Sequence, residues 1–424
     1  MSAVRAVLRD PHWYRDAAGA GLQALAALLL TLAWAARDPD LPRVAWAAFA
    51  GVGLCGWLFL ITAARSARLA ATAARSARLA ATGARSARLA ATGAGELRGL
   101  LLVAMLLAQI GFVLRLSARE PVAPGLEWVV FMISALLFLA VYEVARRPVH
   151  QVLWIATVGV LLAGSVAAVV ATPHGVLEPR LYWRQTLPAA VLAVAVSGAV
   201  VLGCMWRRDR VMREAVRAHV VAVPPLAVYA FTRDPGAATL VCGATAGAVF
   251  GAGRVLWRSS WTATLRPIGT GVAAVVAVAT VLWLFDPWEV AVREPAPARD
   301  LVGVARETAG AVSLADVGGR AGELVLTLLV LVFALQVGLL AARAARPDAE
   351  LPDRHVFQRV WAVALGGQVL ASLLAPLLVG VLRLPAPPTL TTLPFAADGA
   401  SFVVTFAALG LLFAAAQRPP AGAL

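Results

Sequence analysis

Long apolar runs, separated by short polar or basic stretches, dominate this sequence. A helix needs roughly 20 mostly apolar residues to cross about 30 Å of hydrocarbon. The pattern therefore predicts an all-α, polytopic helical membrane protein with about 12 transmembrane helices. The twelve predicted spans are 18–36, 44–64, 99–116, 126–144, 151–172, 186–205, 215–231, 237–253, 267–285, 323–342, 358–382 and 400–416. The seventh and eighth are short, and only 232–236 separates them, so we expect a tight hairpin there.

Composition agrees with this pattern. The chain is 61% hydrophobic and 14% charged, and its mean hydropathy is +0.80. Soluble domains have roughly 45–50% apolar and about 25% charged residues, so an ordinary soluble domain is excluded. We divide the chain into an N-terminal pair of spans at 1–64, a basic segment at 65–98 and ten further spans at 99–424.

Arginine sets the predicted orientation. All 37 basic residues are arginine, and a cytoplasmic N-terminus places 25 of them in inside segments and 12 outside. Cytoplasmic loops of membrane proteins carry the excess of basic residues. We therefore expect a multi-pass protein of the plasma membrane with both termini in the cytoplasm. The formal charge of +14 is then explained by the lipid bilayer, and no nucleic acid partner is expected.

The basic segment contains a tandem repeat. ARSARLAATA at 64–73 is followed by ARSARLAATG at 74–83 and 84–93. Ten residues at about 100° each do not return to one helix face, so the arginines form no fixed stripe. The repeat is either a basic helix on the membrane surface or a duplicated, tolerated loop, and we favour the loop.

Cysteine and histidine give no metal signature. Cys55, Cys204 and Cys242 lie in apolar stretches, and none has a partner at metal-ligand spacing. The five histidines are scattered along the chain. We expect packing cysteines and no metal site of a known type.

Carboxylates at the outer ends of spans are the main candidates for a site. Asp234, Asp286 and Asp398 are each next to Pro or Gly, which interrupt a helix. Broken backbone at membrane depth is tolerated where it lines a cavity or is buried in protein. We predict that these segments converge on one outward-facing cavity roofed by the long loop 286–320, from which Asp316 and Glu307 reach it.

Four segments resemble one family in the same order. They are LEPRLYW at 177–183, RDPGAATL at 233–240, FDPW at 285–288 and LPFAADGAS at 393–401. Together they resemble the SEDS family of membrane glycosyltransferases, the RodA/FtsW/SpoVE type. That family has a ten-span core with a large outer loop between core spans seven and eight. Here the resemblance covers 99–416, so two extra N-terminal spans would precede a SEDS-like core.

The resemblance implies a role in assembling peptidoglycan during growth, division or sporulation. A family member polymerises a lipid-linked disaccharide at the outer membrane face and works with a penicillin-binding transpeptidase. A carboxylate would act as general base, and a divalent cation or arginines would stabilise the leaving diphosphate. The candidate catalytic residues are Asp234, Asp316 and Glu307. The candidate substrate-binding residues are Arg233, Asp286, Trp288, Arg299, Arg306 and Asp398.

One departure from the family bears on activity. Ala311 occupies the position of the family's catalytic Asp, and no His-Thr-Asp sequence is present in the loop. Three interpretations follow from the sequence. The chain is an active, divergent glycan polymerase, a catalytically inactive scaffold for precursor or a transpeptidase, or an unrelated polytopic transporter.

Overall fold

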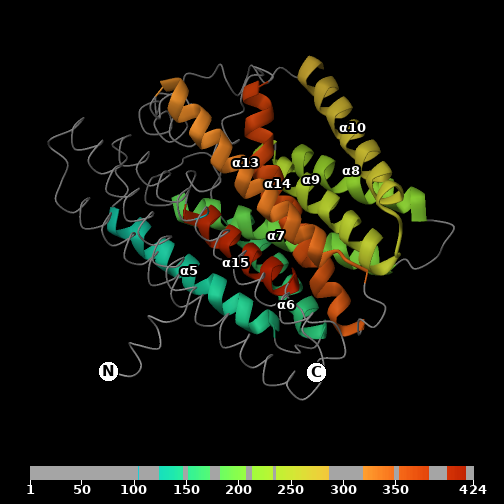
Figure 1. Ribbon diagram of the computed structural model, residues 1–424, viewed down its shortest axis with the longest axis horizontal. Helices are drawn as coiled ribbons and strands as arrows, with labels where there is room; N and C mark the ends of the chain where they lie inside the picture. The colour runs from blue at the N-terminus through green and yellow to red at the C-terminus, as the bar shows by residue number, and fades with distance from the viewer. Residues whose placement is uncertain are drawn as a thin grey trace, which may run out of the picture.

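The computed structural model describes residue 104 and residues 124–146, 151–171, 182–206, 213–232, 235–285, 319–347, 353–381 and 399–416 (Figure 1). These residues form helices and short connections, with no strand among them, so the all-α prediction is confirmed for this part of the chain. The helices are α5 (Pro124–Arg146), α6 (Gln151–Ala171), α7 (Tyr182–Trp206), α8 (Arg213–Thr232), α9 (Pro235–Gly251), the π-helix η1 (Ala252–Leu256), α10 (Trp261–Phe285), α13 (Gly319–Ala344), α14 (Asp353–Val381) and α15 (Gly399–Ala416).

Each predicted span from 126–144 onward coincides with one of these helices. Three described helices contain a stretch long and apolar enough to cross a membrane: Ala238–Leu256, Thr327–Ala344 and Val356–Ala375. Shorter apolar stretches occur at Leu136–Ala145, Val152–Ala167, Val191–Met205, Val216–Ala227 and Val403–Ala416. Spans 18–36 and 44–64 lie outside the described residues, as does 99–116 apart from Ala104, so the count of twelve stays a prediction.

Helices α5, α6 and α7 meet the beginning of α14. Gln358 Nε2 donates a 2.8 Å hydrogen bond to the carbonyl of Ala145, at the end of α5. Trp154, near the start of α6, packs edge-on against Trp361 at a centroid distance of 6.0 Å. Trp361 Nε1 donates to Ser197 Oγ of α7 at 2.9 Å. Helix α6 therefore runs in the same direction as α14, and α5 runs against it.

Helices α8, α9 and α10 continue this alternation. Arg217, in the first turns of α8, reaches the carbonyl of Ala263, in the first turn of α10. A Cβ atom on Gly251, the last residue of α9, would lie 3.3 Å from Val360 Cα, near the start of α14. Helices α8 and α10 thus begin at the end of the bundle where α9 finishes.

Helices α13 and α15 also finish at this end. A Cβ atom on Gly366 of α14 would lie 3.3 Å from Ala341 and 3.2 Å from Leu412, both near the ends of their helices. Tyr142 of α5 packs on Phe413 of α15 at 5.5 Å. We call this end of the bundle the arginine end. Every arginine whose side chain the structure describes lies within about two turns of it: Arg213, Arg217, Arg254, Arg258, Arg266, Arg343, Arg346 and Arg359.

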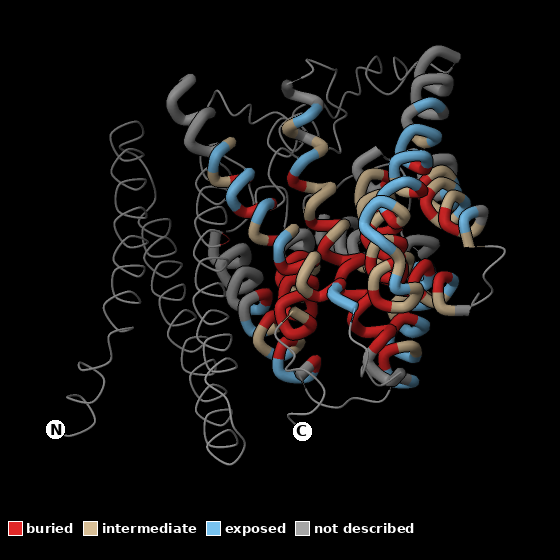
Figure 2. The backbone as a smooth tube through the Cα atoms, turned by 45° about the vertical axis from the view of Figure 1, so that its right-hand side comes forward, coloured by how far each residue is buried: buried red, intermediate tan, exposed pale blue. Residues whose placement is uncertain are grey.

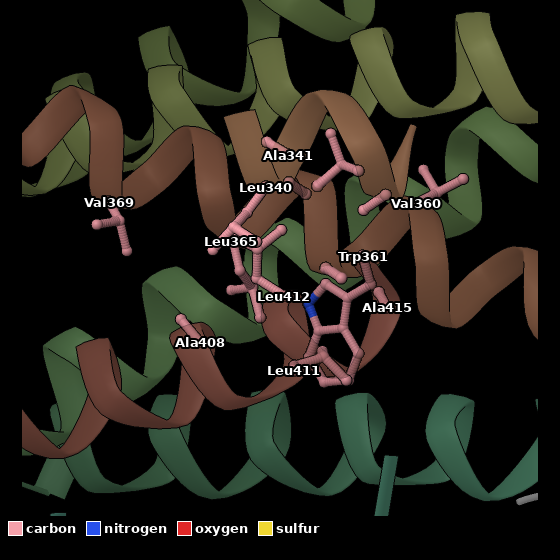
Figure 3. Close-up of a cluster of buried hydrophobic side chains, with 14 of the residues drawn as sticks. Leu340, Ala341, Val360, Trp361, Leu365, Val369, Ala408, Leu411, Leu412 and Ala415 are labelled. Atoms are coloured by element: carbon pink, nitrogen blue, oxygen red, sulfur yellow. The ribbon is translucent and has the colours of Figure 1, made fainter. Parts of the chain in front are cut away.

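The core of the bundle surrounds α14. All residues from Val356 to Gly366 are buried, and their neighbours come from α13 and α15 among others (Figures 2 and 3). Helix α9 approaches α14 through Gly243, Gly247 and Gly251, which are spaced four residues apart. A Cβ atom on Gly247 would lie 2.6 Å from the carbonyl oxygen of Val363. Small residues at this spacing let two helix backbones touch, as in membrane-embedded helix pairs.

The outer surface of the described bundle is apolar as well. Leu328, Leu331, Leu335 and Leu339 form an exposed stripe along α13, and Leu335 is 64% exposed. The other side of the same helix is buried in the core through Phe333 and its neighbours. A helix that is apolar on all sides is typical of a membrane span, because lipid can cover the outward face.

Candidate functional site

The residues that the sequence predicted for a site lie outside the described part of the chain. They are Arg233, Asp234, Asp286, Trp288, Arg299, Arg306, Glu307, Asp316 and Asp398, together with Ala311 at the family's catalytic position. The structure therefore does not test their convergence, and it remains a prediction.

The helix ends next to these residues are described, and they share one location. Helix α9 begins at Pro235, α10 ends at Phe285, α13 begins at Gly319 and α15 begins at Gly399. Because successive helices alternate in direction, all four lie at the end of the bundle opposite the arginine end. The three aspartates and the long loop are thus joined to helix ends on the same side.

Metal-binding geometry is absent from the part of the chain that the structure describes. No group of three His, Cys, Asp or Glu residues gathers there. Cys204 is fully buried in the core and Cys242 is half-buried on α9, and both are free thiols. Their positions fit the packing role predicted for them, whereas Cys55 lies outside the described residues.

The polar site that the structure does describe is the junction of α8, η1 and α10 at the arginine end. Helix α9 widens into the π-helix η1, and the chain then turns through 257–260 into α10. Trp257 N–H donates to the Ala252 carbonyl at 2.9 Å, and Ser259 N–H donates to the Gly253 carbonyl at 2.8 Å. Short π-helical segments inside longer helices are uncommon and occur frequently at functional sites.

A left-handed residue completes this turn. Arg258 has a φ of 50°, a conformation uncommon for residues other than glycine. A Cβ atom on Gly253 would lie 2.6 Å from Thr264 Cγ2, so η1 and α10 are in direct contact. The 257–260 connection is consequently held in a fixed shape against both helices.

Arg217 binds this connection from α8. Its side chain is only 4% exposed, and its Nη2 atom donates to Ser259 Oγ at 2.9 Å. Nη1 donates to the Ala263 carbonyl at 3.4 Å, and the guanidinium carbon lies 4.6 Å from the centre of the Trp257 ring. Planar, weakly hydrated guanidinium groups suit such stacked and forked contacts better than ammonium groups do.

Arg254 binds the same serine from η1. Its Nη1 atom donates to the Ser259 carbonyl at 2.7 Å, and its guanidinium carbon lies 5.1 Å from the centre of the Trp261 ring. Two cationic side chains on different elements therefore meet at Ser259. We call Arg213, Arg217, Arg254, Trp257 and Ser259 the Ser259 cluster.

Polar groups also lie within the core on α14. Gln358, Arg359 and Gln368 are each more than nine-tenths buried in an otherwise apolar helix. Gln358 holds the end of α5, as described above. Polar residues at membrane depth are costly, and they commonly mark pathways or contacts between helices.

The sequence counted Arg217, Arg254 and Arg359 as basic loop residues. It missed the burial of Arg217 and Arg359 and the contacts of Arg254 with Ser259 and Trp261. A signal was present, because Arg254 and Arg258 alternate with two tryptophans in RVLWRSSW at 254–261. Arginine beside tryptophan at a helix end favours cation–π stacking over simple solvation.

Comparison of the chain with protein-family models, with curated proteins and with solved structures finds no match.

Proposed function

We propose that this chain is a multi-pass plasma-membrane protein of cell-envelope assembly that binds lipid-linked disaccharide precursor at its extracytoplasmic face. The arginine end is then cytoplasmic, by the positive-inside rule. The proposal rests on the resemblance of the four segments at 177–183, 233–240, 285–288 and 393–401 to the RodA/FtsW type.

The arrangement of helix ends is the structural observation that supports it most. The starts of α9, α13 and α15 and the end of α10 lie together, opposite the arginine end. These are the helix ends to which Asp234, Asp286, Asp398 and the loop 286–320 are joined. A precursor with a polyprenyl chain in the bilayer and a diphosphate-linked glycan at the surface would meet such an end of the bundle.

Binding is the core of the proposal, and polymerisation is its further step. In the second step an acceptor hydroxyl attacks the anomeric carbon, a carboxylate takes the proton and polyprenyl diphosphate leaves. Asp234, Asp316 and Glu307 are the carboxylates proposed for this role, because Ala311 carries no proton-accepting group.

The test uses the purified full chain in detergent with lipid-linked disaccharide. We expect precursor to bind, and Asp234→Ala or Asp398→Ala to weaken binding by about tenfold, the effect of losing one hydrogen bond to a charged group. The matched control is Glu143→Gln, which removes an exposed carboxylate near the arginine end. Precursor that fails to bind, or binds equally well to all variants, would contradict the proposal.

Polymerisation is measured in the same samples as growth of glycan strands. Strands formed by the wild-type chain but not by Asp234→Ala or Asp316→Ala identify a polymerase. Bound precursor without strands identifies a scaffold that lacks the catalytic step, in agreement with Ala311.

A transporter is the second candidate, and the buried polar residues of α14 favour it. Gln358, Arg359 and Gln368 lie inside the bundle, where transport pathways place their polar residues. Uptake of a solute into vesicles that contain the chain, lost in Gln368→Leu while precursor binding is absent, would favour this candidate.

A further inference from the structure

The Ser259 cluster concentrates positive charge that the described residues do not balance. In this part of the structure, Arg217 and Arg254 approach one carboxylate, that of Glu214, at 3.8 Å from Arg217 Nη1. The Glu214 side chain is 78% exposed, and an ion pair so exposed contributes little. Their other acceptors are neutral: two carbonyl groups and one hydroxyl.

Hydrogen-bond donors in the cluster are also in excess. Three N–H groups there are shielded from solvent and have no acceptor among the described residues: Arg213 Nε, Arg217 Nε and Trp257 Nε1. Arg213 lies one helical turn before Arg217, and Trp257 stacks against Arg217. Buried donors without acceptors cost free energy. A ligand with several acceptor atoms would satisfy these N–H groups.

The guanidinium groups of the Ser259 cluster are suited to bind a tetrahedral oxyanion such as phosphate. Guanidinium groups present forked donors that match phosphate oxygens, and a rigid turn positions two of them here. The hydrogen bonds of Arg217 and Arg254 to Ser259 fix both side chains before any ligand arrives, which reduces the entropy lost on binding. Basic pockets between helices near a membrane surface bind phosphate-bearing headgroups in this manner.

We propose that the α8–η1–α10 junction is a binding site for a phosphate group, held by the guanidinium groups of Arg213, Arg217 and Arg254. The phosphate belongs to an anionic lipid headgroup or to a small phosphate-bearing solute. This site is at the arginine end, so it is separate from the precursor site proposed above and does not depend on it.

The experiment uses the full chain purified in a nonionic detergent, with two probes. One is inorganic phosphate against chloride at matched ionic strength. The other is phosphatidylglycerol against phosphatidylcholine of the same chain length, whose phosphate is balanced by choline. The midpoint of thermal unfolding and the lipids retained in native mass spectrometry report binding, because a ligand that binds the folded state stabilises it.

The variants are Arg213→Gln and Arg254→Gln, with Arg346→Gln as the control. Arg346 is exposed at the same end, so its replacement removes the same charge away from the cluster. Arg213 Nε donates no hydrogen bond to the described residues, so Arg213→Gln should leave the 257–260 turn intact. This variant therefore still tests the site if Arg254→Gln disturbs folding. We expect each cluster variant to weaken binding by about tenfold and Arg346→Gln by less than about twofold.

The two probes identify the source of the phosphate. Stabilisation by inorganic phosphate identifies a small solute, and stabilisation by phosphatidylglycerol alone identifies a lipid headgroup. Absence of both effects overturns the proposal. An equal loss in all three variants also overturns it, because net charge alone would then explain the binding.

Discussion

Trp361 carries a buried polar atom whose hydrogen bond is satisfied inside the apolar bundle. The side chain is 3% exposed, and its indole N–H donates to Ser197 Oγ across the interface between α14 and α7. Ser197 Oγ in turn donates to the Val194 carbonyl in its own helix. The hydroxyl therefore serves two helices at once.

Replacing Ser197 or Trp361 should destabilise the protein, because either change removes the hydrogen bond between them. Ser197→Ala leaves the Trp361 N–H buried without its acceptor, so we expect a loss of about 1–3 kcal/mol in the free energy of unfolding. Trp361→Phe removes the donor and part of the ring, with a loss of similar size. Unfolding of the purified chain in increasing dodecyl sulfate measures each value.

The double variant isolates the hydrogen bond. Because the donor and acceptor are lost together, Ser197→Ala with Trp361→Phe should cost less than the two single changes added, by about 1 kcal/mol. Additivity within about 0.3 kcal/mol would mean that the two side chains do not interact energetically.

Helices α9 and α14 are held together by close contact between their backbones. The sequence of α9, PGAATLVCGATAGAVFG, is rich in residues too small to bury much area, yet its glycines bring its backbone into direct contact with the backbone of α14. A Cβ atom on Gly367 of α14 would in turn meet the Gly243 carbonyl. Stability here comes from backbone contact and dispersion over the shared surface.

A methyl group at the centre of this contact should therefore separate the helices. Gly247→Ala places Cβ 2.6 Å from one α14 backbone atom and 2.9 Å from another, so we expect a destabilisation of about 1–3 kcal/mol. Gly203→Ala on α7 is the control, because nothing lies within 4 Å of that Cβ position. There we expect no loss, or a gain of up to about 1 kcal/mol from helix propensity. Equal effects of the two changes on unfolding in dodecyl sulfate would refute the packing argument.

The hydrophobic pattern of the sequence predicted where the helices lie along the chain. It did not predict which helices contact one another. Runs of apolar residues located every described α-helix from α5 onward, because burial in lipid or protein requires such a run. The expected short hairpin was also correct, since α8 ends at Thr232 and α9 begins at Pro235. The π-helix at Ala252–Leu256 was not predicted, because one extra residue in a helical turn leaves no mark in composition.

The same limit applies to the site. Charge counting placed Arg217 and Arg254 at a membrane surface, but it could not reveal that both bind Ser259, since that pairing depends on tertiary contact. The outer carboxylates Asp234, Asp286 and Asp398 could be placed only relative to helix ends. The sequence thus predicted which helix ends share a side and that one side carries arginines and the other carboxylates.

An asymmetry of charge distinguishes the two ends of the described bundle. The described side chains include eight arginines, and all lie at the end where α5, α7, α9, α13 and α15 finish. The described acidic side chains, Glu143 and Glu214, lie at this end too and are exposed, so they leave it strongly basic. A bundle with one basic end and apolar flanks would settle in a membrane with that end toward the cytoplasm.

Cysteine labelling tests this orientation in intact cells. Cys55, Cys204 and Cys242 are first replaced by alanine, and single cysteines are then introduced at Ser260, which is exposed in the turn before α10, and at Ala309 in the loop 286–320. A thiol reagent that does not cross the membrane should label Ala309→Cys from outside and should reach Ser260→Cys only after the cells are opened. Ser76→Cys in the repeat should behave like Ser260→Cys, because both are predicted to be cytoplasmic. If all three sites label from outside, the chain does not place its basic end in the cytoplasm, and the precursor site would have to be sought on the other face.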